Sequence, residues 1–337
     1  MDFSFSEEQE LLRAQAQEFL GERFPAERIA ELADSEEGWD PASWPELAGL
    51  GWTGVSVSEE EGGAGLGFLE EAVLFEELGG ALYPGPYFST IALALPALTP
   101  ELRKEVAAGE ATWTLALHGK AGLVPDLGVV DRVAVVDEDG IWAVEGESRE
   151  VLETMDPTRR LGRIGLEDAQ RTLLVEGDDA FELAPAIRRR ALAALALEAV
   201  GIAQRALELS IEHAKTREQF GRPIGVYQAV SHALADTYAE TELARSLAYW
   251  AAWCVSEQDE QAPLAAPAAK AFAADAALAA CERAIQVHGG VGFTWEHVLH
   301  RYYKRAQWIE AFEGFGHEQR AEVAHALFDV RAPAAVA

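Results

Sequence analysis

The sequence predicts a mostly α-helical protein with one small β domain in the middle of the chain. Apolar residues recur at helical spacing over most of the chain, whereas short β-branched and aromatic runs are concentrated in residues 111–183. Apolar residues make up 49% and charged residues 25% of the 337 positions, which is typical of folded globular proteins. A chain of this length can bury a core that needs no disulfide or metal staple.

Residues 1–110 are predicted to form an N-terminal helical domain. Ser6, Glu7 and Glu8 open an amphipathic stretch, and carboxylates in a first helical turn complement the helix dipole. Farther along, residues 44–86 alternate helical pieces with glycine-rich turns. We therefore expect helical pieces separated by turns in this part of the chain.

Residues 111–183 are predicted to form the middle β domain. Its β-branched and aromatic runs are WTLALHG, RVAVV, IWAVE and RTLLV. Glu138, Asp139 and Gly140 separate the second run from the third, and an Asp-Gly pair in such a place indicates a β-hairpin.

Residues 184–337 are predicted to form a C-terminal helix bundle. Long Ala- and Leu-rich stretches with short breaks favour helices that pack their apolar stripes together. Cys254 and Cys281 lie in this Ala-rich part and are expected to be small buried residues of a reducing compartment, without a disulfide or metal role.

The formal net charge of −30 argues against nucleic acid and anionic membranes as partners, because like charges repel. No stretch of about 18 uncharged apolar residues occurs, so no membrane span is expected. The first residues are acidic where a signal peptide would be basic, and a cytoplasmic location is expected. The run Arg188-Arg189-Arg190 is the conspicuous basic concentration, and pairing with surface carboxylates is its simplest interpretation.

Residues 216–236 end one predicted helix at a Gly-Arg-Pro corner and begin another. Arg217 can pair bidentately with a phosphate, Phe220 offers an aromatic face, and Gln228 offers an amide. Together these side chains could hold an adenine nucleotide. The alternative is an ordinary corner between two helices.

Residues 284–294 contain a glycine cluster at another predicted helix end. Gly289 and Gly290 let the backbone approach a second molecule closely, and Gln286 lies one turn earlier. Helix C-caps often contain such glycines, so the cluster alone is a weak signal. His288 is interpreted as structural or solvent-facing, because no second His or Cys stands at metal-ligand spacing.

Three patterns occur in one order along the chain: REQFGRPI with a following Gln, QVHGGVG, and the tripeptide Phe312-Glu313-Gly314. They resemble the signatures of the acyl-CoA dehydrogenase family, and GWTGVSVSEEEGGAGLG in the N-terminal half agrees with this resemblance. The resemblance implies an N-terminal α domain, a middle β domain and a C-terminal four-helix bundle. It also implies a dimer or tetramer, whose subunits are either identical or different.

The resemblance implies FAD as the cofactor, an acyl-CoA as the substrate, electron transfer flavoprotein as the acceptor, and a role in fatty-acid and lipid metabolism without a metal. In that family the middle domain of one subunit cradles the flavin, and a neighbouring subunit contributes side chains to the adenosine pyrophosphate. By this resemblance, the contributed residues are Arg217, Phe220, Gln228, Gln286, Gly289 and Gly290.

Glu313 is the catalytic base that the resemblance implies. The family's α,β-dehydrogenation removes an α-proton from the thioester while a β-hydrogen leaves as hydride to flavin N5, and this weakly acidic proton requires a carboxylate in a dry pocket. Glu313 lies 313 − 290 = 23 positions after Gly290, a spacing that resembles one class of family members. The family's other position for this Glu falls near Ala191, where no carboxylate stands. The alternative is a solvated helix-end carboxylate.

Residues 115–131 and Phe315 depart from the family pattern. The segment lacks the loop and strand that hydrogen-bond the flavin ring, and Phe315 stands where a Thr often follows the Glu-Gly pair. An unpaired polar group of a buried ring costs about 1–3 kcal/mol. The sequence therefore predicts weak or no flavin binding by this chain alone.

Two functions remain open at this point. The first is an FAD-dependent acyl-CoA dehydrogenase with Glu313 as its base. The second is a non-catalytic partner subunit of a heteromeric acyl-CoA dehydrogenase, which completes the FAD site of another chain. A flavin-dependent monooxygenase or nitroalkane-oxidising relative is disfavoured, because such proteins usually replace or reposition the Glu. The length and branching of the acyl chain depend on pocket shape and are not predicted.

Overall fold

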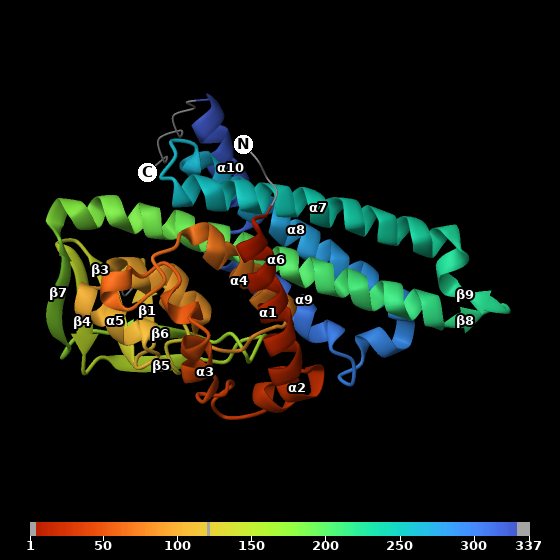
Figure 1. The fold of residues 1–337 in the computed structure, drawn as a ribbon, viewed down its shortest axis with the longest axis horizontal. Coiled ribbons are helices and arrows are strands. Elements are labelled where there is room, and N and C mark those ends of the chain that lie inside the picture. The colour runs from red at the N-terminus through yellow and green to blue at the C-terminus, as the bar shows by residue number, and fades with distance from the viewer. Residues whose placement is uncertain (1–4, 120–121, 329–337) are drawn as a thin grey trace, which may run out of the picture.

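The computed structural model describes residues 5–119 and 122–328 of the chain. Within these ranges short helices come first, strands follow, and long helices come last, as the sequence predicts. The strands of the middle part lie at one end of the long helices, and the small β8–β9 hairpin lies at the other end (Figure 1).

The N-terminal part begins with a capped helix. The Ser6 hydroxyl accepts a hydrogen bond from the Gln9 backbone N–H at 3.1 Å, and the Gln9 side chain accepts one from the Ser6 N–H at 3.0 Å. The elements of this part are α1 (Glu7–Arg23), α2 (Ala26–Ala33), α3 (Ser43–Gly49), η1 (Trp52–Gly54), η2 (Glu59–Glu61), α4 (Phe68–Gly80), η3 (Phe88–Ala94), η4 (Leu95–Ala97) and α5 (Pro100–Ala107).

The middle part forms two small sheets, with strand orders β1-β3-β4-β7 and β2-β6-β5. The predicted hairpin is present, because β3 and β4 pair antiparallel with Asp137 opposite Gly140. The four predicted runs became β1, β3, β4 and β7, whereas the polar strand β5 and the glycine-flanked β6 carry no clear strand pattern. The strands are β1 (Trp113–Ala116), β2 (Val124–Pro125), β3 (Arg132–Asp137), β4 (Gly140–Glu145), β5 (Ser148–Leu152), β6 (Leu161–Gly165) and β7 (Gln170–Glu176).

The C-terminal part is built on three long helices, α6, α7 and α8, with α9 and α10 packed against α8. Helix α6 begins at Gly177, earlier than residue 184, and includes Pro185. A proline removes one backbone hydrogen bond, but the first turns of α6 also contact β4 and β7. The elements are α6 (Gly177–Thr216), β8 (Glu218–Gln219), β9 (Arg222–Pro223), η6 (Ile224–Val226), α7 (Gln228–Ser256), α8 (Ala262–His288), η7 (Gly289–Phe293), α9 (Leu299–Ala311) and α10 (Gly316–Phe328).

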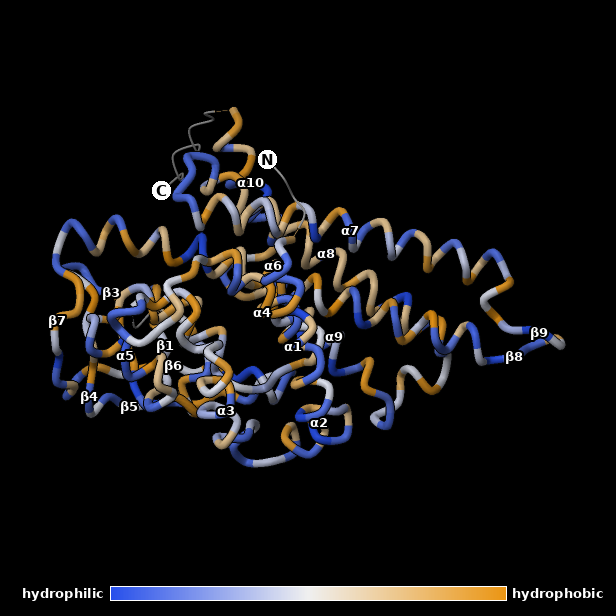
Figure 2. The backbone as a smooth tube through the Cα atoms, in the orientation of Figure 1, coloured by the Kyte–Doolittle hydropathy of each residue, from blue (hydrophilic) through white to orange (hydrophobic). Residues whose placement is uncertain are grey.

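Helix α8 lies in the interior of the bundle. The stretch Ala262–Phe293 is long and apolar enough to cross a membrane, but 67% of its most apolar window is buried inside the protein, as in the core helix of a globular protein. Cys254 and Cys281 are buried and unpaired, as expected. By contrast, the β8–β9 hairpin beyond the helices is mainly hydrophilic (Figure 2).

Two buried ion pairs tie the middle part to the bundle. Arg159 donates two hydrogen bonds to Glu198 on α6, at 2.9 and 2.8 Å. Asp156 accepts a hydrogen bond at 2.5 Å from Arg305 on α9. Because removing one partner of such a pair leaves an uncompensated buried charge, these contacts hold the loop before β6 firmly against α6 and α9.

Candidate active site

Glu313 lies in the turn between α9 and α10 with a left-handed backbone conformation, φ 59°. For a residue other than glycine this conformation costs about 1–3 kcal/mol and persists only where the surroundings hold it. Gln319 and Arg188 donate hydrogen bonds to the Glu313 carbonyl oxygen at 2.6 and 3.1 Å, and Lys270 donates one to the Gly314 carbonyl. Three side chains from α6, α8 and α10 therefore hold this turn.

Lys270, on the buried helix α8, holds the turn that contains Glu313. Its ammonium also donates a hydrogen bond to the Glu310 carbonyl oxygen at 2.7 Å, at the end of α9. Burial lowers the pKa of Lys270 to about 8. A lysine in this environment stays in place because backbone carbonyls satisfy its donors.

The Glu313 side chain is only 4% exposed. Its two carboxylate oxygens lie 3.1 and 3.0 Å from His118 Nε2, and Oε2 lies 3.2 Å from Arg188 Nε. Arg188 also donates two hydrogen bonds to Glu322 on α10, at 2.9 and 2.8 Å. The hydrogen bond with Glu313 raises the pKa of His118. Glu313 is thus a buried carboxylate in a charged cluster, and its interpretation as a solvated helix-end residue was wrong.

A cavity of about 450 Å³ lies against this carboxylate. Its polar side is lined by His118, Arg188, Glu313, Glu318 and Glu322. Its apolar side includes Leu123, Leu161, Trp308, Ala311 and Phe312, and the Trp308 and Phe312 rings stack at 4.7 Å. A carboxylate at the wall of an apolar cavity is placed to accept a proton from a carbon atom of a bound apolar group.

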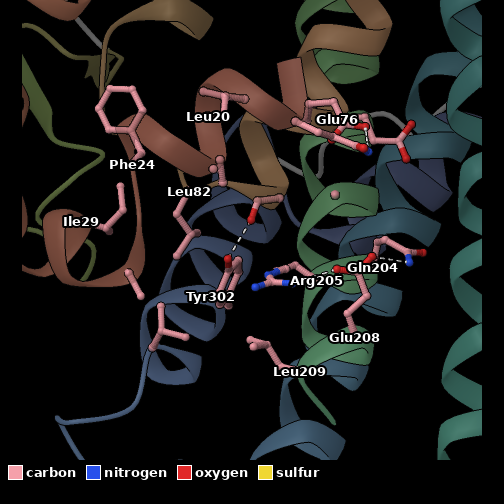
Figure 3. A pocket seen from close by; sticks show the side chains of 18 of the residues that line it. Leu20, Phe24, Ile29, Glu76, Leu82, Gln204, Arg205, Glu208, Leu209 and Tyr302 are labelled. Atoms are coloured by element: carbon pink, nitrogen blue, oxygen red, sulfur yellow. Dashed lines mark hydrogen bonds and ion pairs between the residues drawn. The ribbon is translucent and has the colours of Figure 1, made fainter. Parts of the chain in front are cut away.

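A second cavity, of about 820 Å³, lies between the N-terminal helices and the bundle (Figure 3). It shares no lining residue with the cavity at Glu313. Its charges are paired with one another: Arg13 contacts Glu76 and Glu77, and Arg205 contacts Glu208. The Tyr302 hydroxyl donates a hydrogen bond to the Gly80 carbonyl at 2.7 Å. The charged side chains of the larger cavity are therefore engaged mainly with one another.

The residues predicted to contact a nucleotide lie at the far end of the bundle. The β8–β9 corner and the start of α7 carry one group, and the end of α8 carries the other. His213 near the end of α6 stacks on His288 at the end of α8 with 4.3 Å between ring centroids, so both groups occupy the same end. All six residues are exposed: Arg217, Phe220, Gln228, Gln286, Gly289 and Gly290.

This end of the bundle is remote from Glu313. Arg188 contacts Glu313, and Arg217 follows it after 217 − 188 = 29 residues, nearly all within the single helix α6. At a rise of 1.5 Å per residue, the two positions are separated by about 43 Å along the helix. Glu313 and the predicted cofactor residues of one chain therefore lie at different places in the fold.

Two family descriptions match this chain. "Acyl-CoA dehydrogenase, N-terminal domain" matches residues 6–100, and "Acyl-CoA dehydrogenase, C-terminal domain" matches residues 189–328. The chain belongs to the acyl-CoA dehydrogenase family. Members of this family are FAD-dependent oxidoreductases, and the order of α, β and α parts described above is that of the family fold.

Individual acyl-CoA dehydrogenases resemble the chain over most of its length. Acyl-CoA dehydrogenase IpdE2 of Mycolicibacterium smegmatis is 33% identical over 305 residues, which cover 89% of this chain and 93% of that protein. A chain of the steroid ACAD Tcur3481-Tcur3483 has a TM-score of 0.85 at 28% identity, covering 96% of this chain and 98% of that one. A chain of the ChsE4-ChsE5 complex from Mycobacterium tuberculosis has a TM-score of 0.88 at 26% identity, covering 98% and 100%.

The described part of this acyl-CoA dehydrogenase chain does not fit a flavin ring unaided. In the predicted cradle, residues 115–131, positions 120 and 121 lie outside the described residues. Of the described residues in this segment, Leu123 and His118 line the cavity, and His118 is hydrogen-bonded to Glu313. Among the described lining side chains, the charged groups contact one another or backbone, and the indole N–H of Trp308 is a buried donor without a partner. A flavin ring here would find the Trp308 N–H among these described side chains and would need further donors from elsewhere.

His118 and Lys270 are site residues that sequence reasoning missed. His118 is 195 positions from Glu313, and no local pattern links two residues at that separation. The prediction that the arginine run pairs with surface carboxylates was only partly correct. Arg190 pairs with Glu71, which is fully buried, and Arg188 belongs to the candidate active site.

Proposed function

We propose that the chain is a subunit of an FAD-dependent acyl-CoA dehydrogenase, in which Glu313 removes the α-proton of an acyl-CoA thioester. The observation that carries this proposal is the Glu313 carboxylate, which is 4% exposed, held in a strained turn and placed at the wall of an apolar cavity. When bound, FAD supplies the hydride acceptor for the β-hydrogen. Electron transfer flavoprotein is the proposed acceptor of the electrons, and the cytoplasm is the proposed location.

The chain's own residues perform the proton half of the reaction. Arg188, Lys270 and Gln319 keep the turn in place through its carbonyl oxygens, so the carboxylate needs no reorganisation when substrate arrives. The apolar wall, which includes Trp308 and Phe312, excludes water around the thioester α-carbon. One Glu313 oxygen then accepts the proton.

The exposed end of the bundle supports an oligomer in which this chain completes the flavin site of another. Phe220 is 93% exposed, and Phe293 and Trp295 on the segment after α8 are 82% and 77% exposed. Large exposed apolar side chains gathered at one end mark an interaction surface. Arg217 and Gln286 would add a guanidinium and an amide for the pyrophosphate of the bound nucleotide. Two of the similar solved structures are named as pairs of chains, which favours a heteromer.

A second candidate function is that of a non-catalytic partner, which only completes the FAD site of another chain. The observation that favours it is the pairing of the Glu313 carboxylate with both Arg188 and His118. These two contacts occupy the carboxylate oxygens that a substrate proton would have to reach.

The substitution Glu313→Gln separates the two candidates. In the FAD-loaded assembly we expect turnover to fall by about 10²–10⁴-fold, because the proton acceptor is lost while the shape of the side chain is retained. The FAD content should stay unchanged. Glu138→Gln, at an exposed position in the β3–β4 turn, is the matched control and should keep full turnover. Unchanged turnover in Glu313→Gln would instead establish the partner role.

A further inference from the structure

His118 stands directly in front of the Glu313 carboxylate. The His118 Nε2 atom is almost equidistant from both oxygens, at 3.1 and 3.0 Å, so it faces the carboxylate between its two oxygens. Arg188 takes a further position on Oε2 at 3.2 Å. A carboxylate offers about four lone-pair sites, and these contacts leave few of them for an incoming C–H proton. His118 and Arg188 therefore cover the carboxylate.

We propose that His118 is a positioning residue that covers Glu313 and must leave its carboxylate before substrate can reach it. This inference rests on the proposed role of Glu313 as the base. It concerns a histidine in the β1–β2 connection, where a flavin-binding loop was expected from family resemblance.

The exposure of the two partners decides which of them can move. The His118 side chain is 55% exposed, whereas that of Glu313 is 4% exposed and its turn is fastened to three helices. The imidazole can therefore rotate into solvent without repacking the core. Gly122 leaves room for the His118 side chain, because a Cβ at position 122 would lie 2.9 Å from the His118 Cβ.

The protonation state of His118 determines how strongly its imidazole binds the Glu313 carboxylate. The hydrogen bond to Glu313 raises the pKa of His118 above its usual value of 6.5, and the nearby Arg188 charge opposes this rise. Charge-assisted hydrogen bonds are roughly twice as strong as neutral ones. The strong hydrogen bond between His118 and Glu313 is thus present below the raised pKa of His118 and is lost as the pH rises through that pKa. The other charged groups that line the site are Lys270 from α8 and Glu318 and Glu322 from α10.

The contact can be tested without any turnover. Nitrogen-15 NMR of histidine-labelled chain, in the assembly in which it purifies, would give the pKa of His118 in the wild type and in Glu313→Gln. We expect the wild-type pKa to lie above 6.5 and to fall in the variant, because the anionic partner is lost. His232, exposed on α7, is the internal control and should not change. An unchanged His118 pKa in Glu313→Gln would overturn the proposal.

The covering role is tested by the pH dependence of kcat/KM in the FAD-loaded assembly. In the wild type, kcat/KM should rise about tenfold per pH unit until the His118 pKa is reached, because one proton must leave. His118→Gln cannot carry a charge, so its acid limb should move to lower pH and its kcat/KM at pH 6 should exceed that of the wild type. His232→Gln should retain the wild-type profile.

Coincident profiles for His118→Gln and the wild type would overturn the covering role. Failure of the proposed function has a different signature, since Glu313→Gln would then keep its turnover. The NMR measurement reports the contact in either case, so the two failures can be told apart.

Discussion

Two buried carboxylates show how single residues carry strain and charge in this protein. Glu313 and Asp126 both adopt left-handed backbone conformations, at φ 59° and 55°. Glu313 is surrounded by cationic partners, whereas Asp126 accepts a neutral hydrogen bond from the Ser89 hydroxyl at 2.8 Å. Burial raises the pKa of Asp126 to about 6, although the nearby Arg159 charge opposes the rise. Similar backbone positions thus hold carboxylates in opposite electrostatic environments.

Asp126 should make the wild type lose stability as the pH rises. Its folded pKa of about 6 exceeds the usual value of 3.8, so the folded state binds the proton more tightly. This stabilisation is fully present below the usual pKa and is lost as the pH rises through the folded pKa. The loss amounts to up to about 3 kcal/mol at 1.36 kcal/mol per pKa unit. Asp126→Asn keeps the left-handed backbone and the Ser89 bond. Urea denaturation at pH 4.5 and 7.5 should therefore show a smaller fall in the free energy of unfolding for Asp126→Asn.

The control for this prediction is Asp168→Asn, at an exposed position between β6 and β7, which should follow the wild type at both pH values. Equal pH dependence in Asp126→Asn and the wild type would show that Asp126 titrates normally.

The close crossing of helices α4 and α6 depends on glycine residues at the contact. A Cβ at Gly201 would collide with the carbonyl oxygen of Glu76, and a Cβ at Gly79 would collide with that of Glu198. The two helices therefore meet at backbone contact. Glu198 and Glu76, the residues at this crossing, also pair with Arg159 and Arg13, so the close approach positions the buried charges as well.

Gly201→Ala should destabilise the protein by about 1–3 kcal/mol, because α4 must move to admit the methyl group. The matched control is Gly21→Ala on α1, where nothing lies within 4 Å of the added Cβ. That substitution should instead stabilise the helix by about 0.5–1 kcal/mol. Urea denaturation of both variants measures the difference, and equal effects of the two substitutions would contradict close packing at the crossing.

At the scale of the whole molecule, α6 separates the two parts of the proposed function. Its first turns carry Arg188 beside Glu313, and the corner after its last turn carries Arg217. About 43 Å of helix separates them, so in the proposed arrangement a second chain completes the site at each end. Oligomerisation is therefore part of the proposed chemistry.

The chain expressed alone should purify without stoichiometric FAD, and a flavin-cradling partner chain should restore FAD binding. Absorption spectroscopy of the purified proteins measures the flavin. Arg217→Ala should lower the FAD content of the assembly, because a phosphate-pairing guanidinium is lost. Arg163→Ala, which removes an exposed arginine of β6, is the control and should leave FAD content unchanged. A yellow homotetramer that is active alone, with one FAD per chain, would contradict this arrangement.

Local patterns account for what could be predicted. The β3–β4 hairpin follows from an Asp-Gly pair between two β-branched runs, and the buried Cys254 and Cys281 follow from Ala-rich helices. Strand β5 was not predicted because three of its five residues are polar and most are exposed. The spacing of Glu313 from Gly290 singled out the carboxylate, but it contained nothing about the donors that hold its turn.

The order of α, β and α parts, the family, and the candidate base all follow from the chain's own text, because helical periodicity, strand runs and short motifs are properties of neighbouring residues. Packing determined the rest. It buried Glu313, brought His118 across 195 positions to its carboxylate, and placed Arg217 at the opposite end of α6. Such contacts depend on how helices and sheets meet in space, and residues far apart in a chain carry no local signal of that meeting.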